Sequence, residues 1–321
     1  MPAEGAGAAS LTVVILTYNE EQHIDRAIAS LAALSPRVVV VDSGSRDQTV
    51  ALAKARGAEV LVHPFVNQAQ QFQWAMDHAA VTSDWVMRLD ADEVIEADLA
   101  AEILTGLPTL PRDVTGVNLR RKHIFMGRWI RHGGRFPLTM LRLWRRNKAH
   151  IEQRWMDEHM VLEEGRAVTF LGGFADHNLG DLTHFTAKHN AYATREAIDV
   201  LGSKYGLVPE QATAGQASWR AGGKRLLKEQ LYNRLPFWVS ATSYFLFRYI
   251  VQLGFLDGRE GLIYHALQAG WYRFLVGARV LELERAIAPL KDRQARIEAL
   301  GRLTGFDLGS GGVAGDLPGR D

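Results

Sequence analysis

The sequence predicts an α/β protein with a mixed, mainly parallel sheet, flanking helices and a helical C-terminal extension. Three patterns support this fold class. Short apolar runs rich in β-branched residues alternate with helix-like stretches in the first part of the chain. A β-containing pattern follows from about residue 112 to 174, and residues 182 to about 303 are mostly helix-like. Because strands that alternate with helices form βαβ units, the first part should build a parallel sheet.

Four strands are expected in the first part, and the first two are apolar runs suited to burial on both faces. The four strands cover residues 11–18, 38–42, 59–63 and 84–90. Three helix-like stretches carry apolar residues on one face and separate the strands. These are residues 19–34, a turn and short helix that ends at Gly57, and residues 68–80.

The same patterns predict the domain organisation. Residues 11–180 are expected to form one domain, with halves at about 11–110 and 111–180, and residues 181–303 a helical extension. The ends, 1–10 and 304–321, are rich in glycine and small residues and are expected to be disordered.

The charge balance and the lack of cysteine limit the classes of function. Lysine and arginine total 37 against 36 aspartates and glutamates, so the charge gives no reason to expect a nucleic-acid partner. The absence of cysteine excludes a disulfide and a zinc–thiolate site and favours a reducing compartment. The first ten residues lack the features of a signal peptide, so a cytoplasmic location is expected.

Polar and acidic residues follow three of the expected strands. Thr17 to Glu20 follow the first strand, Asp42 to Gly44 the second, and Asp90 to Glu93 the fourth. In open sheets of this kind, ligands bind outside the carboxyl ends of the strands. The three segments therefore predict one ligand site at that edge.

The Asp90-Ala91-Asp92 segment has the chemistry of a cation site. Carboxylates two residues apart can bind a hard divalent cation, which could bridge a diphosphate and stabilise charge on a departing phosphate. The alternative is a helix N-terminus, where acidic residues are favoured. That alternative explains Glu93 well and Asp90 poorly.

The other two strand ends also have a structural alternative. Asp42 can accept hydrogen bonds from a base or a ribose, but aspartate is also common in Asx-turns and caps. Thr17 and Glu20 can likewise be capping residues.

Taken together, TYNE, VDSGSRDQT and LDADE, in this order on these strand ends, resemble glycosyltransferase family 2. The resemblance covers roughly Leu11 to Val94 and implies the GT-A fold and a nucleotide-sugar donor. It implies a nucleoside pocket, a ribose or sugar contact at Asp90, and Mg²⁺ or Mn²⁺ held on the diphosphate by Asp92. The expected nucleotide-sugar-binding residues are Thr17, Tyr18, Asn19, Glu20, Asp42, Ser43, Gly44, Arg88, Asp90 and Ala91.

Two later segments extend the resemblance. RLWRRNKAHIEQRWMDEHMV is similar to the acceptor-side segment of the family, where a carboxylate acts as general base on the acceptor hydroxyl. Asp157 and Glu158 are the candidate catalytic residues, with Glu158 favoured because sequences that this segment resembles tend to end it with a glutamate next to a histidine, as Glu158 and His159 do here. A surface turn is the alternative. FADHNLGDLTHF resembles a subgroup that includes lipopolysaccharide-core and exopolysaccharide glycosyltransferases, and His177 is a candidate metal ligand.

Basic residues are missing from one place where many relatives carry them, and they are grouped at another place in this chain. Many relatives carry a basic residue and an asparagine in the helix before the fourth strand, whereas this chain has glutamines, so the diphosphate is expected to rely on metal or on Arg88. A basic group near the acceptor side could meet a lipid diphosphate or an anionic sugar, or could protect an exposed strand edge. The group comprises Arg135, Arg142, Arg145 and Arg146.

The extension contains an aromatic and basic segment. Between Trp219 and Arg248 the only acidic residue is Glu229, and the apolar run 235–247 is too short to span a membrane. An anionic membrane surface is favoured, with a buried helix as the alternative. Resemblance of the C-terminal segment to the same envelope subgroup implies a lipid-linked acceptor and a peripheral enzyme on the cytoplasmic face.

The expected function is inverting, metal-dependent transfer of a hexose from a nucleotide-diphosphate donor, with UDP favoured. The expected acceptor is a cell-envelope glycan or a lipid-linked saccharide, as in lipopolysaccharide or polysaccharide biosynthesis. A nucleotidyltransferase is an alternative, although the segment after the first strand is acidic and lacks a Gly-rich basic loop. A dinucleotide-dependent oxidoreductase is disfavoured because GAGAAS precedes the first strand. A catalytically inactive scaffold protein of the same fold is the remaining alternative.

Overall fold

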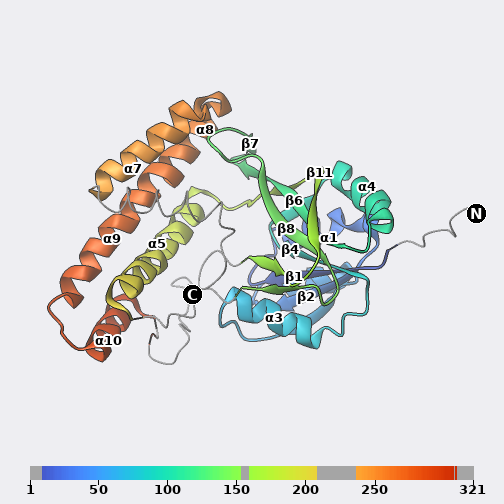
Figure 1. Ribbon diagram of the computed structural model, residues 1–321, viewed down its shortest axis with the longest axis horizontal. Helices are drawn as coiled ribbons and strands as arrows, with labels where there is room; N and C mark the ends of the chain where they lie inside the picture. Colours follow the sequence, from blue (N-terminus) through green and yellow to red (C-terminus); the bar gives the residue numbers. More distant parts are fainter. Residues whose placement is uncertain (1–8, 153–158, 208–235, 307, 309–321) are drawn as a thin grey trace, which may run out of the picture. The chain divides into compact units, whose positions relative to one another are not determined.

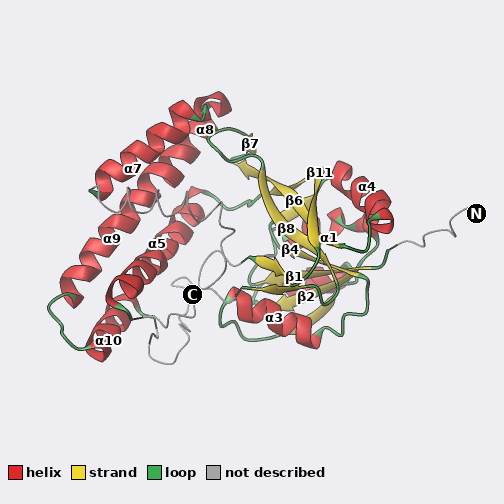
Figure 2. Ribbon diagram, viewed as in Figure 1, coloured by secondary structure: helices red, strands yellow, loops and turns green. Residues whose placement is uncertain are grey.

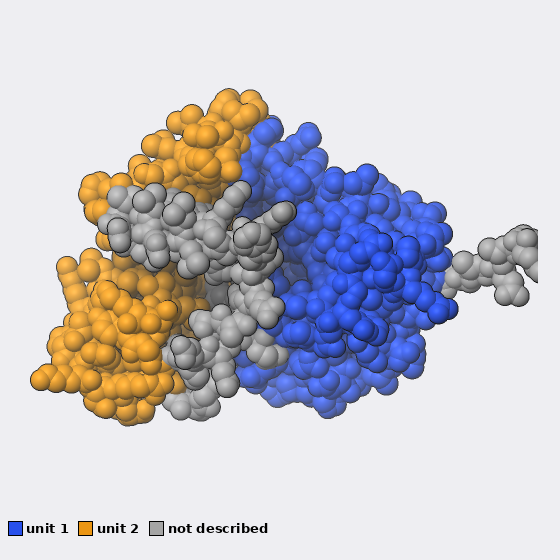
Figure 3. Space-filling model, in the orientation of Figure 1, with its two compact units in different colours: residues 1–179 blue, residues 180–321 orange. Residues whose placement is uncertain are grey.

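The computed structural model describes residues 9–152, 159–207, 236–306 and 308. The chain forms two compact units, residues 1–179 and residues 180–321 (Figure 3). This division falls one residue before the boundary expected from the sequence.

The first half of unit 1 is a parallel sheet. Its strands lie in the order β3-β2-β1-β4, and each pair of neighbours is parallel. The register pairs Thr17 with Asp42 and Leu16 with Asp90, so these strand ends are neighbours at one edge of the sheet. The bounds are β1 Leu11–Thr17, β2 Arg37–Asp42, β3 Glu59–Val62 and β4 Trp85–Asp90.

Helices cover both faces of this sheet (Figures 1 and 2). On one face, Val13 and Ile15 pack in a core with residues of α1, α2 and α4. On the other face, Val14 packs in a core with Phe72 of α3. This two-sided burial explains the continuous apolar runs. The bounds are α1 Ile24–Ser30, α2 Thr49–Ala55, α3 Gln68–His78 and α4 Ala97–Gly106.

Two helix boundaries differ from the sequence expectation. The first helix begins at Ile24 rather than near residue 19, because Asn19 adopts a positive φ of 53° and leaves the strand in a turn. Glu93 does not begin a helix: Glu93–Ile95 is strand β5, and α4 begins at Ala97. The helix-terminus explanation of Glu93 is therefore wrong.

The second half of unit 1 extends the same sheet and makes it mixed. The order continues β4-β8-β6-β11-β5, with β8 antiparallel to both neighbours and β11 parallel to β6. The strands are β6 Val114–Phe125, β7 Arg128–Ile130, β8 Leu138–Arg145 and β11 Arg166–Asp176; β9 Ala149–Ile151 and β10 Met160–Leu162 form a separate two-stranded sheet, and η2 is Leu107–Thr109.

Unit 2 is helical in its described residues. Its cores bring α5 together with α9 and α10, through residues such as Leu201, Leu283 and Leu300. Helix α7 packs against η6 and α9, so the segment from 237 to 287 forms a helical hairpin. The elements are α5 Leu182–Tyr205, α7 Phe237–Leu246, η4 Phe247–Val251, η5 Gly254–Asp257, α8 Gly258–His265, η6 Ala266–Trp271, α9 Tyr272–Ile287 and α10 Arg293–Thr304.

These features confirm the expected fold class, a mixed and mainly parallel sheet with flanking helices and a helical C-terminal part. Within the described ranges, every helix is too short or too polar to cross a membrane.

Candidate functional site

The Asp42 carboxylate is hydrogen-bonded within the turn that follows β2. Asp42 is 1% exposed, and its Oδ2 accepts hydrogen bonds from the N–H groups of Gly44 (2.9 Å) and Ser45 (2.8 Å). Its Oδ1 accepts from the hydroxyls of Thr17 (3.1 Å) and Ser45 (2.5 Å). A carboxylate has about four acceptor positions. Asp42 can therefore contact a nucleoside only by exchanging one of these bonds.

The loop after β1 is tied to the loop after β2. The Asn19 N–H donates to the Ser45 hydroxyl (2.8 Å), and the Arg46 N–H donates to Asn19 Oδ1 (2.9 Å). The Glu20 N–H donates to Thr49 Oγ1 (2.7 Å). Half-buried Tyr18 lies in the same loop. The two loops, residues 18–20 and 43–49, are thus hydrogen-bonded to each other beside the strand ends, and they include residues expected at the nucleoside pocket. We call these two loops the ledge.

His23 supports this ledge and was missed by the sequence analysis. Its Nε2 accepts a hydrogen bond from the Leu179 N–H (2.9 Å), so the ring proton of a neutral imidazole lies on Nδ1. That nitrogen is 2.6 Å from Glu20 Oε2, to which it donates. His23 therefore fixes the Glu20 carboxylate against the end of unit 1. Its position three residues after Glu20 was the available signal.

Gln71 is the glutamine of α3 that reaches this region. It is fully buried, and its Nε2 donates to the Ser43 hydroxyl (3.1 Å) and to the His63 carbonyl (3.0 Å). One of the glutamines in the helix that departs from the family pattern therefore supports Ser43.

A buried cluster of charge surrounds Asp90. Arg142 Nη2, from β8, donates to Asp90 Oδ2 (3.0 Å) and to Glu93 Oε1 (2.6 Å). Arg88, expected near the diphosphate, is 7% exposed and donates from Nε to Asp90 Oδ1 (3.3 Å). The Asp90 N–H donates to Glu93 Oε2 (2.8 Å). Glu93, assigned by sequence to a helix start, instead joins a four-residue ionic network.

The pKa shifts in this network follow from burial and charge. Burial opposes ionisation of Asp90, but Arg142 and Arg88 outweigh it and hold the pKa of Asp90 well below its usual range. Burial raises the pKa of Glu93 despite Arg142, and the Asp90 charge adds to the rise. Burial lowers the pKa of Arg142, but the two carboxylates outweigh it and raise the value.

The expected basic group does not form one surface. Arg142 is buried against Asp90 and Glu93, at the carboxyl end of β4. Arg145 pairs in register with Trp85 at the opposite end of β4, with its guanidinium 4.6 Å from the Trp85 ring, and donates to the Val114 carbonyl (2.9 Å). These two side chains have structural partners, because β8 runs antiparallel to β4 and carries them to opposite ends.

The two expected metal ligands, Asp92 and His177, are joined through their backbones. The His177 N–H donates to the Asp92 carbonyl (3.0 Å), and Asn178 Nδ2 donates to Asp92 Oδ2 (3.1 Å). Arg26 donates to the His177 carbonyl. Burial and the Arg26 charge lower the pKa of His177, which favours the neutral imidazole needed for metal binding.

The side chains of Asp92 and His177 are suited to a cation that a bound diphosphate would also coordinate. Among the described residues, no group of three or more histidine, cysteine, aspartate or glutamate side chains could hold a metal by itself. A magnesium-type ion on a diphosphate commonly takes only one or two protein carboxylates, with phosphate and water as further ligands. Asp92 and His177 are consistent with that mode.

Asp176 forms a further ionic group that the sequence analysis missed. Its carboxylate lies 3.1 Å from His123 Nδ1 and 3.7 Å from Arg121 Nη1. Burial opposes its ionisation, but His123 and Arg121 outweigh it and hold its pKa below the usual range. The β5–β11 register pairs Asp176 with Glu93, which places this group beside the Asp90 cluster.

The candidate bases Asp157 and Glu158 lie outside the described residues. The residues on either side of this segment are hydrogen-bonded to each other: the Glu152 N–H donates to the His159 carbonyl (2.9 Å) beside the β9–β10 pair.

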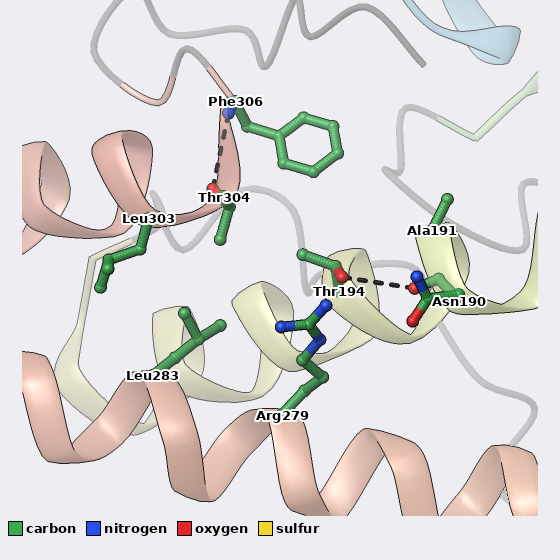
Figure 4. Close-up of a pocket in the computed structure, with 8 residues that line it drawn as sticks. All are labelled: Asn190, Ala191, Thr194, Arg279, Leu283, Leu303, Thr304 and Phe306. Atoms are coloured by element: carbon green, nitrogen blue, oxygen red, sulfur yellow. Dashed lines mark hydrogen bonds between the residues drawn. The ribbon is translucent and has the colours of Figure 1, made fainter. Parts of the chain in front are cut away.

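A cavity of about 140 Å³ lies within unit 2, between α5, α9 and α10 (Figure 4). Arg279 extends from α9 toward Thr194 of α5, and its Nη1 donates to Glu282 (2.7 Å). None of the residues lining this cavity belongs to the strand-end site. They are Asn190, Ala191, Thr194, Arg279, Leu283, Leu303, Thr304 and Phe306.

The domain that carries the acidic carboxyl edge of the sheet is of the glycosyltransferase class by comparison with known families. Residues 12–171 match the family model described as Glycosyl transferase family 2. The chain belongs to that family through this domain, which includes β1 through most of β11.

Relatives agree with this assignment. Over 93 residues the chain is 40% identical to an uncharacterized glycosyltransferase of Rickettsia typhi, covering 29% of this chain and 31% of that protein. It is 26% identical over 200 residues to the lipopolysaccharide core biosynthesis glycosyltransferase LpsC of Rhizobium meliloti, covering 58% of this chain and 70% of LpsC. The chain thus spans only about a third of the length of the rickettsial relatives it matches.

Among solved structures, glucosyl-3-phosphoglycerate synthase of Mycobacterium tuberculosis, in complex with Mn²⁺, UDP and glucosyl-3-phosphoglycerate, is 24% identical. The match covers 38% of this chain and 50% of that chain, with a TM-score of 0.29.

Proposed function

We propose that this chain transfers a hexose from a nucleotide-diphosphate donor, with UDP favoured, to an envelope glycan or a lipid-linked saccharide. One observation carries the proposal: the register of β1 with β2 and β4 gathers the Asp42 turn and the Asp90–Asp92 segment at one edge. That edge is where open α/β sheets bind ligands, and the family domain spans it.

The donor would lie on the ledge formed by the loops after β1 and β2. The Asp42 turn presents the backbone and hydroxyl of Ser43, with Gln71 behind it. Asp90 stays ionised beside Arg142, so it can accept hydrogen bonds from ribose or sugar hydroxyls. Arg88 acts through Asp90, by holding its carboxylate in place.

Asp92 and His177 are the residues that would hold Mg²⁺ or Mn²⁺. When bound, the ion supplies Lewis-acid stabilisation of negative charge on the departing diphosphate. Asn178 orients the Asp92 carboxylate, and Arg26 fixes the His177 backbone.

Transfer with inversion needs one general base on the acceptor. An acceptor hydroxyl is too weak an acid to ionise by itself, so its proton must pass to a base as it attacks the anomeric carbon. The acceptor oxygen then bonds to that carbon as the bond to the diphosphate breaks. Glu158 or Asp157 is our proposed base, on the family resemblance of that segment.

An envelope or lipid-linked acceptor is supported by the relative named for lipopolysaccharide core biosynthesis. The aromatic and basic composition of residues 219–248 supports peripheral contact with the cytoplasmic face of a membrane.

Calorimetry tests the donor site. UDP, GDP and dTDP are titrated with and without Mn²⁺ into the wild type, Asp92→Ala and Asp77→Ala, the last changing an exposed carboxylate on α3. We expect Mn²⁺-dependent binding of one nucleotide by the wild type and Asp77→Ala, lost in Asp92→Ala. No binding by well-folded wild type would support the inactive-scaffold alternative.

A further inference from the structure

The helical hairpin 237–287 carries a concentration of exposed apolar side chains at its end, between α7 and α8. We define the hairpin tip as residues 246–256, which cover the last residue of α7, η4 and most of η5 (Figure 1). Seven large apolar side chains in these eleven residues are each at least 44% exposed. They are Leu246, Phe247, Ile250, Val251, Leu253, Phe255 and Leu256.

The charged groups at the tip lie on its inside. Arg248 is the only charged residue within the tip, and it is 5% exposed, with its guanidinium 5.5 Å from the Tyr244 ring. Just beyond the tip, Asp257 and His265 are 2% and 0% exposed, whereas Arg259 is exposed and Glu260 is half-buried. Soluble surfaces normally show the reverse arrangement, and an exposed apolar concentration of this kind marks an interaction site.

The backbone of the tip is closely packed at Gly254. A Cβ added to Gly254 would lie 2.6 Å from the His265 ring and 2.9 Å from the Arg248 carbonyl, so the backbone of the tip rests directly on these residues. Leu253 holds a positive φ of 61° in the same turn. There is therefore no room for a side chain on the inner side of the tip at Gly254.

The size of the tip argues against a second protein chain. Stable interfaces take roughly 20–30 residues and about 800 Å² from each partner, whereas the tip offers eleven residues. A lipid interface needs no complementary shape and accepts a projecting apolar end. The sequence between Trp219 and Pro236 has five basic residues against one acidic residue, which favours anionic headgroups.

We propose that the hairpin tip inserts into the interface of an anionic lipid bilayer. The inference makes the proposed membrane contact specific and moves it from the run 235–247 to residues 246–256. In the earlier run, Ala241 is buried and Phe237 packs on Phe274 of α9. It rests on that proposed contact and not on sugar transfer, so vesicle binding and nucleotide binding are measured separately.

The absence of cysteine in the chain allows a clean probe. Val251→Cys (66% exposed) and, as control, Leu303→Cys on α10 (57% exposed) are labelled in the full chain with an environment-sensitive fluorophore. Vesicles contain phosphatidylcholine with about one-third phosphatidylglycerol. We expect a blue shift at position 251 and none at position 303. No shift at 251, or an equal shift with pure phosphatidylcholine, would overturn the proposal.

A second measurement separates insertion from self-association. Ile250→Ser combined with Val251→Ser should weaken vesicle binding roughly tenfold, whereas Leu171→Ser combined with Leu303→Ser, at similarly exposed positions, should leave it unchanged. A circular dichroism spectrum and a thermal unfolding midpoint that match those of the wild type show that each variant is folded. A blue shift at 251 that grows with protein concentration in the absence of lipid would overturn the proposal in favour of a second copy of the chain.

Discussion

Arg142 on β8 donates from a single nitrogen to Asp90 (3.0 Å) and Glu93 (2.6 Å), and thereby pairs with two carboxyl groups at the buried end of β4. All three residues are buried or half-buried, so none is well solvated. Removing one partner of such a group leaves uncompensated charge in the protein interior.

Arg142→Met should therefore destabilise unit 1 strongly. We expect a loss of about 3–5 kcal/mol in the free energy of unfolding, measured by urea denaturation at neutral pH. Arg146→Met is the matched control, because Arg146 is the neighbouring exposed arginine, and it should change stability by less than about 0.5 kcal/mol. Similar values for the two variants would show that the cluster contributes little.

Gly44→Ala should weaken nucleotide binding through the turn after β2. Gly44 has a φ of 88°, which costs an L-residue about 1–2 kcal/mol, and the turn aligns the N–H groups that bind Asp42. Gly57→Ala is the control, since Gly57 has a φ of 79° and equally open surroundings but lies after α2. Both should lose similar stability, but only Gly44→Ala should raise the calorimetric Kd for UDP. Equal Kd values would separate this turn from the donor site.

Asn178→Ala should weaken metal-dependent binding without removing a ligand. The Asn178 amide donates to Asp92 Oδ2 (3.1 Å), and residues that orient a metal ligand in this way affect metal affinity by roughly 10–100-fold. We expect UDP binding in Mn²⁺ to weaken about tenfold, with binding in excess EDTA unchanged as the internal control. A loss of equal size in EDTA would indicate a direct contact with the nucleotide.

Asp199 on α5 should make the stability of unit 2 depend on pH. Burial and the Glu196 charge raise its pKa from 3.8 to about 6. The folded chain then binds this proton more tightly than the unfolded chain, so stability is highest below pH 3.8, falls as pH rises toward 6, and stays constant above.

Asp199→Asn should remove that effect and stabilise the protein above pH 6 by at most about 3 kcal/mol. Denaturant titrations of both proteins at several pH values measure the difference, with Asp77→Asn, at an exposed position of α3, as the control. Parallel pH profiles for the wild type and Asp199→Asn would contradict the assignment.

Local patterns in the sequence predicted much of the fold. The runs that became β1, β2 and β4 are apolar because both faces of the sheet are covered, and the polar ends of those strands marked the edge that holds Asp42 and Asp90. The helix boundaries at Asn19 and Glu93 were missed, because a positive φ and a three-residue strand are set by tertiary contacts.

Contacts across the sheet could not be predicted. Arg142 lies 52 residues after Asp90, and their meeting depends on the antiparallel register of β8. The same register sends Arg145 to the far end of β4, which no charge pattern indicated. Asp176 and His123 likewise meet through the β6–β11 pairing.

The position of β8 also governs how unit 1 can move. It is hydrogen-bonded on one side to β4 of the nucleotide half and on the other side to β6 of the acceptor half. Opening one half against the other would break a continuous backbone ladder in the middle of the sheet. Hinge motion between the halves is thereby suppressed, and adjustment to a substrate must arise in the loops that leave the strand ends.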